Sequence, residues 1–116
     1  MKRIITTVAA VLATGGGITF AAPAGAQPPC DDGNFCIFHD KGGGGSHYSL
    51  DQGIGDLGGV AGGLNDHVFS VWNRDDRNWC LYADADHGNQ LLLVTRGPLI
   101  DLEERVAFQV SSVEPC

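Results

Sequence analysis

The sequence predicts an all-β fold in which two Greek-key motifs pack as a β-sandwich stapled by two disulfides. Short apolar or alternating runs are separated by Gly, Asn and Asp, which is typical of strands joined by tight turns. Helical periodicity is scarce. A duplicated pattern indicates two similar halves, each apolar on one face, that would need each other to close a core.

Six runs are expected to form strands, because each is rich in β-branched, aromatic or aliphatic residues and is bounded by turn residues. They are residues 35–38, 48–50, 68–72, 79–82, 90–95 and 107–113. The duplication rests on two matches. Cys36-Ile37-Phe38 resembles Cys80-Leu81-Tyr82, and residues 64–68 resemble residues 102–106.

The N-terminal residues 1–26 have the features of a secretory signal peptide. Lys2 and Arg3 precede an apolar run, and Ala24-Gly25-Ala26 supplies the small side chains of a cleavage site. The apolar run is too short and too glycine-interrupted for a membrane anchor, which needs ~20 apolar residues. We therefore expect a secreted, extracellular protein whose single domain spans residues 27–116.

The charge of the chain limits its partners. There are 14 acidic against 7 basic side chains, and signal cleavage would remove two of the basic ones. A surface this acidic repels nucleic acid and anionic membranes, so neither is expected as a partner. A monomer is expected.

The cysteines Cys30, Cys36, Cys80 and Cys116 form an even set in a small exported domain, which favours two disulfides over free thiols or a zinc site. Four cysteines allow three connectivities. The turn sequence between Cys30 and Cys36 favours a local bridge, which leaves Cys80 to pair with Cys116.

Three segments together resemble a known family. They are Cys36-Ile37-Phe38, the stretch from Asn65-Asp66 to Trp72-Asn73-Arg74, and Trp79-Cys80-Leu81-Tyr82. They are similar to the secreted actinobacterial peptidase inhibitors, whose type member inhibits a metalloproteinase and has a βγ-crystallin fold. The resemblance implies an inhibitor of an extracellular protease, namely a thermolysin-like zinc metalloprotease, that blocks the active-site cleft reversibly. It also implies the disulfide pairing given above.

The resemblance also implies a place for protease contact. In the family, the bond after the cysteine that matches Cys80 is the candidate reactive site. Trp79, Cys80, Leu81 and Tyr82 are therefore candidate contacts, with Arg77 and Asn78 of the preceding polar loop beside them. The alternative is that residues 79–82 form a buried core strand.

Calcium is the one cofactor that the resemblance suggests, and only as a weak site. Calcium-binding βγ-crystallins use the pattern Asn/Asp-Asn/Asp-x-x-Ser/Thr-Ser, and here Asn65, Asp66 and Ser70 match it while Phe69 replaces the coordinating hydroxyl. Calcium takes six to eight oxygen ligands, so a polar turn without metal is the favoured interpretation. No cofactor is otherwise expected.

Catalytic patterns are missing from the sequence. The serines are not in a nucleophile elbow, and the histidines lack the spacing of a zinc site. We therefore expect a protein that is not an enzyme. The alternative to an inhibitor is a calcium-binding or stress-related βγ-crystallin-like structural protein without a protease target.

Overall fold

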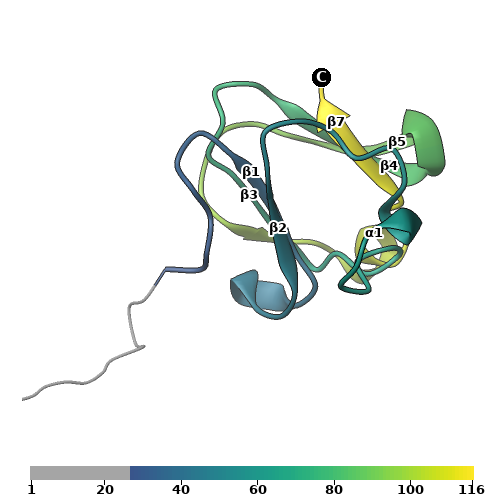
Figure 1. The fold of residues 1–116 in the computed structure, drawn as a ribbon, viewed down its shortest axis with the longest axis horizontal. Coiled ribbons are helices and arrows are strands. Elements are labelled where there is room, and N and C mark those ends of the chain that lie inside the picture. The colour runs from purple at the N-terminus through teal and green to yellow at the C-terminus, as the bar shows by residue number, and fades with distance from the viewer. Residues whose placement is uncertain (1–26) are drawn as a thin grey trace, which may run out of the picture.

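The protein is a sandwich of two antiparallel β-sheets, seen in a computed structural model that describes residues 27–116 (Figure 1). The signal peptide expected at residues 1–26 lies outside the described residues. One sheet has the strand order β2-β1-β3-β6 and the other the order β5-β4-β7. The strands are β1 (Phe35–Phe38), β2 (His47–Leu50), β3 (Ser70–Asn73), β4 (Trp79–Asp84), β5 (Gly88–Val94), β6 (Ile100–Asp101) and β7 (Ser112–Pro115). The predicted fold class is thus confirmed.

The core lies between the two sheets and is built from both halves of the chain. Phe35, Ile37 and Val71 from the first sheet are buried against Trp79 and Leu81 from the second. The Phe35 and Trp79 rings stack with their centroids 4.7 Å apart. Neither half could bury its apolar face alone, because the opposing layer comes from the other half.

Each half also contributes an edge segment to the other half's sheet. β6 belongs to the second half but pairs with β3 of the first, with Ile100 opposite Val71. In return, Ile54 of the first half forms a bridge with Val113 of β7. The two Greek keys are therefore interlocked by an exchange of edge segments.

Both predicted disulfides are present. Cys30 bonds to Cys36, and Cys80 bonds to Cys116. The first bridge closes a loop that lies against the outer face of the first sheet, where Cys30, Cys36 and Phe38 form a small second cluster. The second bridge fastens the last residue of the chain to the central strand β4.

The internal duplication is real, but its register differs from the one predicted. The β1–β2 hairpin is closed by Ser70, whose hydroxyl accepts from Gly43 N (2.9 Å) and donates to Asp40 O (2.6 Å). Ser112 closes the β4–β5 hairpin in the same way, through His87 N (3.0 Å) and Asp84 O (2.6 Å). Ser70 therefore corresponds to Ser112, an offset of 42 residues instead of 38, so the counterpart of Phe69 is Ser111 and not Ala107.

The predicted strand at residues 107–113 is wrong in its first part. A single helical turn, α1 (Glu104–Ala107), precedes it, and β7 starts only at Ser112. The backbone N–H groups of Val106 and Ala107 both bond to Glu103 O. Val106, Ala107 and Val110 face the core at helical spacing, which explains why this apolar run does not extend as a strand.

The hairpin tips are single turns of 3-10 helix at Lys41–Gly43 and Ala85–His87. In the second hairpin the ring of His87 packs edge-on against Tyr82, with 5.3 Å between centroids. In the first hairpin Gly43 has a positive φ, and a Cβ at this position would meet Pro28 at 2.5 Å. The N-terminal segment thus occupies the space that a side chain on the first hairpin would fill.

Candidate functional site

The segment 79–82, for which protease contact was expected, forms the middle strand of its sheet. Trp79, Cys80, Leu81 and Tyr82 are all buried. β4 is hydrogen-bonded to β5 on one side and to β7 on the other, so its backbone is covered as well. The folded protein does not offer the Cys80–Leu81 bond to a protease. Burial agrees with the alternative considered for these four residues, a strand of the core.

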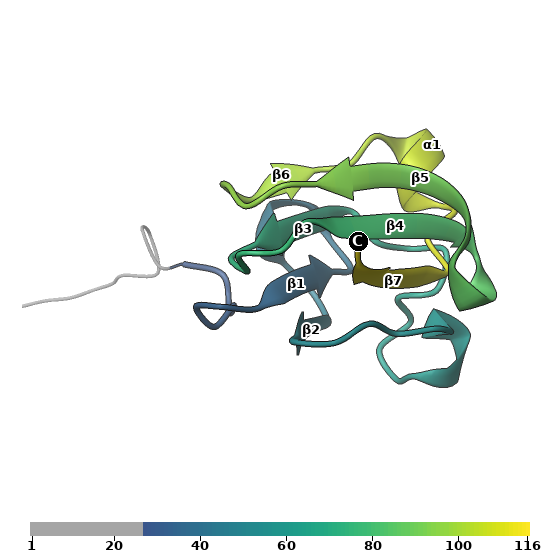
Figure 2. The same ribbon diagram turned by 90° about the horizontal axis from the view of Figure 1, so that it is seen from above.

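The loop that precedes β4 is the accessible part of the predicted site. Residues 74–78 connect β3 in one sheet to β4 in the other, at the end of the sandwich (Figure 2). The Asp76 side chain is 96% exposed and that of Arg77 is half-exposed. Arg77 and Asn78 are thus placed where a partner could reach them.

Asn73, the last residue of β3, supports this loop from inside the protein. Its side chain is almost fully buried. The Nδ2 group donates to Arg77 O and to Val94 O, both at 2.9 Å, and Oδ1 accepts from Asp75 N at 2.9 Å. One amide therefore joins both arms of the loop to the neighbouring strand β5.

Asp75 provides a second internal support. Its buried carboxylate accepts from Trp79 Nε1 at 2.9 Å and from Arg77 Nε at 2.8 Å. Burial alone would raise the pKa of Asp75, but the hydrogen bonds from Trp79 and Arg77 outweigh it and hold this pKa below its ordinary value. Asp75 is thus a buried anion whose partners belong to the loop and to β4.

The C-terminal arm of the loop is tied to the second disulfide. Cys116 N donates to Asn78 O at 2.9 Å, and Cys116 is bonded to Cys80, two residues after Asn78. On the other side, Arg77 Nη2 donates to Asp51 O at 2.7 Å. The exposed residues Asp76 and Arg77 therefore project from a backbone that is held at both ends.

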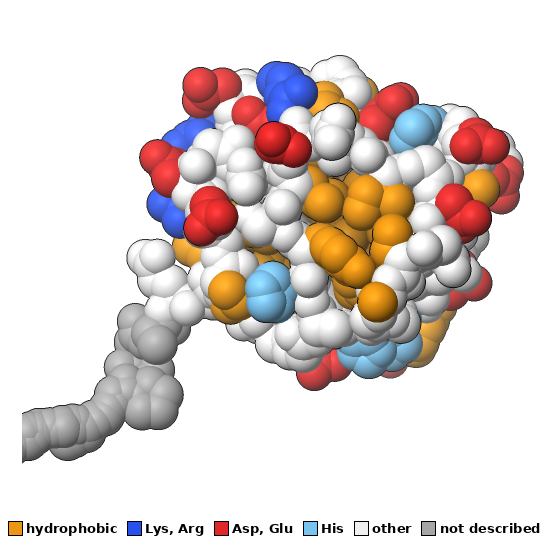
Figure 3. Space-filling model, viewed as in Figure 1, with side chains coloured by type: hydrophobic (Ala, Val, Ile, Leu, Met, Phe, Trp, Pro, Cys, Tyr) orange, Lys and Arg blue, Asp and Glu red, His pale blue; other side chains and the backbone are white. Residues whose placement is uncertain are grey.

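A network of opposite charges surrounds the N-terminal arm of the loop. Arg74 Nη1 donates to Cys30 O at 2.6 Å, and Arg96 lies 3.3 Å from Asp32 and 3.4 Å from Asp76. Figure 3 shows Lys and Arg side chains interspersed with acidic ones at this end of the molecule. The network links the loop to the segment closed by the Cys30–Cys36 disulfide.

The residues considered for calcium differ in exposure and in their partners. Ser70 is buried, and its hydroxyl is used to close the first hairpin. Asn65 and Asp66 are exposed, and Asp66 Oδ1 accepts from Ser111 Oγ of the second half at 3.2 Å. Within residues 27–116, no group of three or more His, Cys, Asp or Glu side chains is arranged to hold a metal ion.

Two supporting residues, Asn73 and Asp75, were not singled out from the sequence. The sequence did contain a signal for them. In a turn, an Asn or Asp side chain commonly accepts a hydrogen bond from the backbone two residues further on, as Asn73 does from Asp75 N. What the sequence did not indicate is that both side chains point inward.

The part of the chain described by the structure has no helix long and apolar enough to cross a membrane.

Comparison with known proteins identifies the family. The model of peptidase inhibitor family I36 matches residues 23–94, which is more than half of the chain. The chain belongs to peptidase inhibitor family I36. This membership makes it a protease inhibitor rather than an enzyme, as the sequence predicted. None of the curated proteins is similar enough in sequence to count as a match.

Solved structures similar to this I36 chain show the same fold. A βγ-crystallin domain from work on the evolution of the eye-lens fold superposes with a TM-score of 0.66 at 19% identity, covering 78% of this chain and 91% of its own. A βγ-crystallin from Ciona intestinalis gives 0.61 at 23%, covering 72% and 100%. The N-terminal domain of protein S gives 0.57 at 20%, covering 72% and 99%. These identities establish the βγ-crystallin fold alone.

Proposed function

We propose that this protein inhibits an extracellular, thermolysin-like zinc metalloprotease by placing the loop of residues 74–78 reversibly in the active-site cleft. The observation that carries the proposal is an exposed loop tip on a buried scaffold. Asp76 and Arg77 project into solvent, while Asn73 and Asp75 hold the loop from inside.

The rigidity of the loop is the physical basis of inhibition. A flexible segment loses conformational freedom when it enters a protease cleft, and that loss weakens binding. Here the loop is fixed beforehand by Asn73, by Asp75 and by the bond from Cys116 N to Asn78 O. A fixed backbone also resists the distortion that peptide-bond cleavage requires, so the protein would stay bound rather than be degraded.

The kind of protease is inferred from the resemblance to a family of secreted inhibitors whose type member acts on a metalloproteinase. An extracellular target agrees with two disulfides in a small domain, since such bonds persist outside the reducing cytosol. It also agrees with the secretory signal expected at residues 1–26. We assign contact to the 74–78 loop and not to the Cys80–Leu81 bond, because β4 is buried.

An inhibition assay with matched variants tests the proposal. The mature chain should slow the hydrolysis of a peptide substrate by a thermolysin-type enzyme. Arg77→Ala removes a tip contact and Asn73→Ala loosens the support, so both should raise the inhibition constant at least about tenfold. Lys41→Ala, at an exposed position in the tip of the first hairpin and at the other end of the sheet, should leave it unchanged.

Mass spectrometry after the assay separates the two variants. Asn73→Ala should be cleaved within residues 74–78, because its loop can now adapt to the protease. A tenfold molar excess of the parent that leaves the rate unaltered would exclude enzymes of the thermolysin class as targets. Inhibition by Arg77→Ala equal to that of the parent would remove the loop assignment.

Calcium binding is a second candidate function that one contact favours. The Asp66 carboxylate of the first half meets the Ser111 hydroxyl of the second half at 3.2 Å, and calcium prefers oxygen ligands of this kind. Titration with calcium, followed by the fluorescence of Trp72 and Trp79, tests it. An unchanged spectrum at about 1 mM calcium, the affinity range of weak extracellular sites, counts against this function.

A further inference from the structure

A five-residue loop is too small to bind a protease alone. A stable interface takes about 20–30 residues from each partner. The loop of residues 74–78 supplies five, and Asp75 among them is buried. If this loop enters the active-site cleft, other segments at the same end of the sandwich must meet the rim of that cleft. The contacts of the loop with its neighbours show which segments lie there.

The segment 31–34, which the Cys30–Cys36 disulfide closes into a loop, lies directly beside residue 74. Gly33 N donates to Arg74 O at 3.0 Å, and Arg74 N donates to Asn34 O at 2.9 Å. These bonds continue the pairing of β1 with β3 beyond the ends of both strands. The first three residues of the segment are exposed, so a partner that covers the 74–78 loop can also reach them.

The turn of residues 95–98, which leads from β5 to β6, flanks the same loop on its other side. β1 and β6 are the two neighbours of β3 in the first sheet, so segments attached to them lie on either side of the loop that follows β3. Gly97 N donates to Asn73 O at 3.1 Å, directly before that loop. Thr95, Arg96 and Pro98 are exposed. The loop therefore has an exposed segment on each side.

Arg96 joins the three segments through its guanidinium group. Nη1 donates to Arg74 O and to Asp76 Oδ1, the latter at 3.4 Å, and Nη2 donates to Asp32 Oδ1 at 3.3 Å. A planar guanidinium holds several acceptors at fixed angles, which the ammonium group of a lysine does not. The position of the loop tip relative to residues 31–34 is thus set from the turn 95–98.

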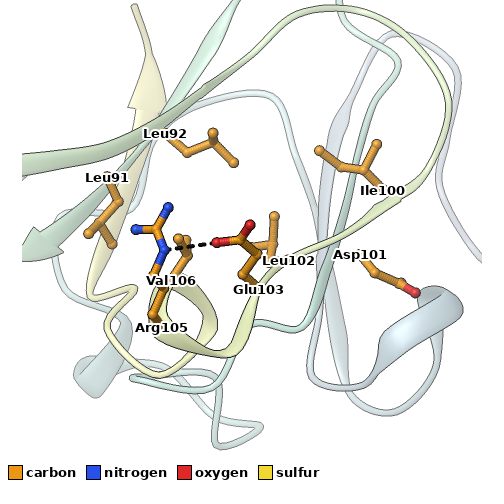
Figure 4. Close-up of a pocket in the computed structure, with 8 residues that line it drawn as sticks. All are labelled: Leu91, Leu92, Ile100, Asp101, Leu102, Glu103, Arg105 and Val106. Carbon is orange, nitrogen blue, oxygen red and sulfur yellow. Dashed lines mark ion pairs between the residues drawn. The ribbon is translucent and has the colours of Figure 1, made fainter.

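Arg105 provides a contrast, because its ion pair joins residues of one segment. Its Nε lies 2.8 Å from Oε1 of Glu103, two residues earlier, and both side chains line the pocket between β5 and α1 (Figure 4). The partners of Arg96, by comparison, are 20 to 64 positions away. Ala107 O accepts from Val68 N, ahead of β3, so α1 lies at the opposite end of β3 from residue 74. Arg105 is therefore a matched control for Arg96.

We propose that residues 31–34 and 95–98 form one contact surface for the protease together with the loop 74–78, and that Arg96 is the positioning residue of this surface. The inference rests on the proposed function, which places that loop in the cleft. The side chains of Asp76 (96% exposed) and Asp32 (73%) project further into solvent than that of Arg96 (50%). Exposed ion pairs contribute little to folding stability. The effect of Arg96 is thus to fix the two carboxylates before binding, which lowers the entropic cost of association.

Substitution of Arg96 in the mature, disulfide-bonded chain tests the positioning role. Arg96→Ala should raise the inhibition constant for a thermolysin-type enzyme about tenfold and leave the midpoint of urea unfolding unchanged. Arg96→Lys should recover only part of the inhibition, because it keeps the charge but not the geometry. Arg105→Ala removes an arginine from an exposed ion pair and should change neither quantity.

Nitrogen-15 relaxation of the free protein measures the same role without a protease. The order parameter of the Asp76 amide should be near about 0.85 in the parent and in Arg105→Ala, and below about 0.6 in Arg96→Ala. If Asp76 stays as rigid in Arg96→Ala as in the parent, the role given to Arg96 is wrong.

Bulky substitutions test the contact surface itself. Asp31 and Thr95 are exposed, and within residues 27–116 their side chains make no hydrogen bond, so a larger side chain there should not disturb the fold. Asp31→Trp and Thr95→Trp should each raise the inhibition constant at least about tenfold by steric exclusion. Lys41→Trp, in the tip of the first hairpin, should not.

The outcomes separate this inference from the proposed function. Inhibition by Asp31→Trp and Thr95→Trp equal to that of the parent would overturn the three-segment surface and leave the 74–78 loop as the contact. A parent that inhibits no thermolysin-type enzyme would overturn the proposed function and the contact surface with it. The order parameter of Asp76 would still decide whether Arg96 positions the loop.

Discussion

Asp75 is the residue on which the geometry of the candidate site depends most directly. Its carboxylate is buried, and a buried charge is stable only when hydrogen bonds and opposite charge replace its water. Here Trp79 Nε1 and Arg77 Nε donate hydrogen bonds to the carboxylate in place of that water. Because one donor belongs to the core strand and the other to the loop, the same carboxylate joins the loop to the core.

Substitution of Asp75 by Asn should change how stability depends on pH. The pKa of Asp75 in the folded protein lies below its ordinary value of 3.8, so the charged form stabilises the fold. This stabilisation is present above pH 3.8 and is lost as pH falls through the lower pKa of the folded state. Urea unfolding at a series of pH values should show a smaller acid-induced loss of unfolding free energy in Asp75→Asn than in the parent.

At neutral pH, Asp75→Asn should itself lower the free energy of unfolding by about 1.5–3 kcal/mol, the usual contribution of a hydrogen bond to a charged group. Asp76→Asn is the matched control, because Asp76 carries the same charge on an exposed side chain in the same loop. If both variants lost stability with acid as the parent does, the role given to Asp75 would be wrong.

The sequence predicted the neighbourhood of the candidate site better than its individual residues. The loop before β4 was correctly expected to be polar, and Arg77 and Asn78 are accessible. The prediction left open whether Trp79 to Tyr82 contact a protease or form a buried core strand, and in the structure they are buried. The local pattern of a short apolar run is the same for an edge strand and a central strand. Only the long-range pairing of β4 with both β5 and β7 decides between them.

At the scale of the elements, the two hairpins depend on one serine each. Ser70 and Ser112 are buried, and each hydroxyl satisfies one backbone N–H and one backbone carbonyl of its hairpin tip. Ser70→Ala or Ser112→Ala leaves both groups without that partner. Each substitution should lower the free energy of unfolding by about 1–3 kcal/mol. Thermal unfolding measures the loss.

An exposed hydroxyl is the control for the hairpin serines. Ser46 donates to Gly62 O at the protein surface, so water can replace the hydroxyl in Ser46→Ala. This variant should lose clearly less stability than the other two. Equal losses in all three would mean that closure of the hairpins is not what the buried serines contribute.

The disulfides should differ in their effect on stability. Cys80–Cys116 spans 36 residues, and Cys30–Cys36 spans 6. A disulfide stabilises a protein by lowering the conformational entropy of the unfolded chain, and more so when it closes a longer loop. This effect predicts a contribution to stability of about 3.8 kcal/mol for the long loop and about 2.4 kcal/mol for the short one. Urea unfolding of the two double Cys→Ala variants should therefore show the larger loss for Cys80 with Cys116. The reverse order would show that the short bridge acts through the packing around Cys30, Cys36 and Phe38.

The elements that sequence reasoning found are those with a strong local signal. β1 was predicted with its true bounds, and the predictions for β2, β4 and β5 differ from the structure only at their ends. β6 was missed because its two residues, Ile100 and Asp101, become a strand only by pairing with β3. The single turn α1 was missed because four residues are too few to establish a helical period, and only its last residue, Ala107, fell within a predicted strand.

At the scale of the whole molecule, the exchange of edge segments makes the two halves one cooperative unit. β6 completes the sheet of the first half, and Ile54 extends that of the second. The core is shared as well, since Phe35 of the first half stacks on Trp79 of the second. The duplication was evident in the sequence, whereas the exchange was not, because no local pattern records which sheet an edge segment joins.

Separation of the chain into residues 27–78 and 79–116 should therefore leave two unfolded fragments. Each fragment keeps its own disulfide, because neither bridge connects the two halves. Any loss of folding must then come from the missing partner layer and exchanged segments, not from a missing cross-link. Each fragment alone should show no near-ultraviolet circular dichroism, and an equimolar mixture should recover the signal of Trp79 packed on Phe35. A fragment that unfolds cooperatively by itself would show that one Greek key can close its own core.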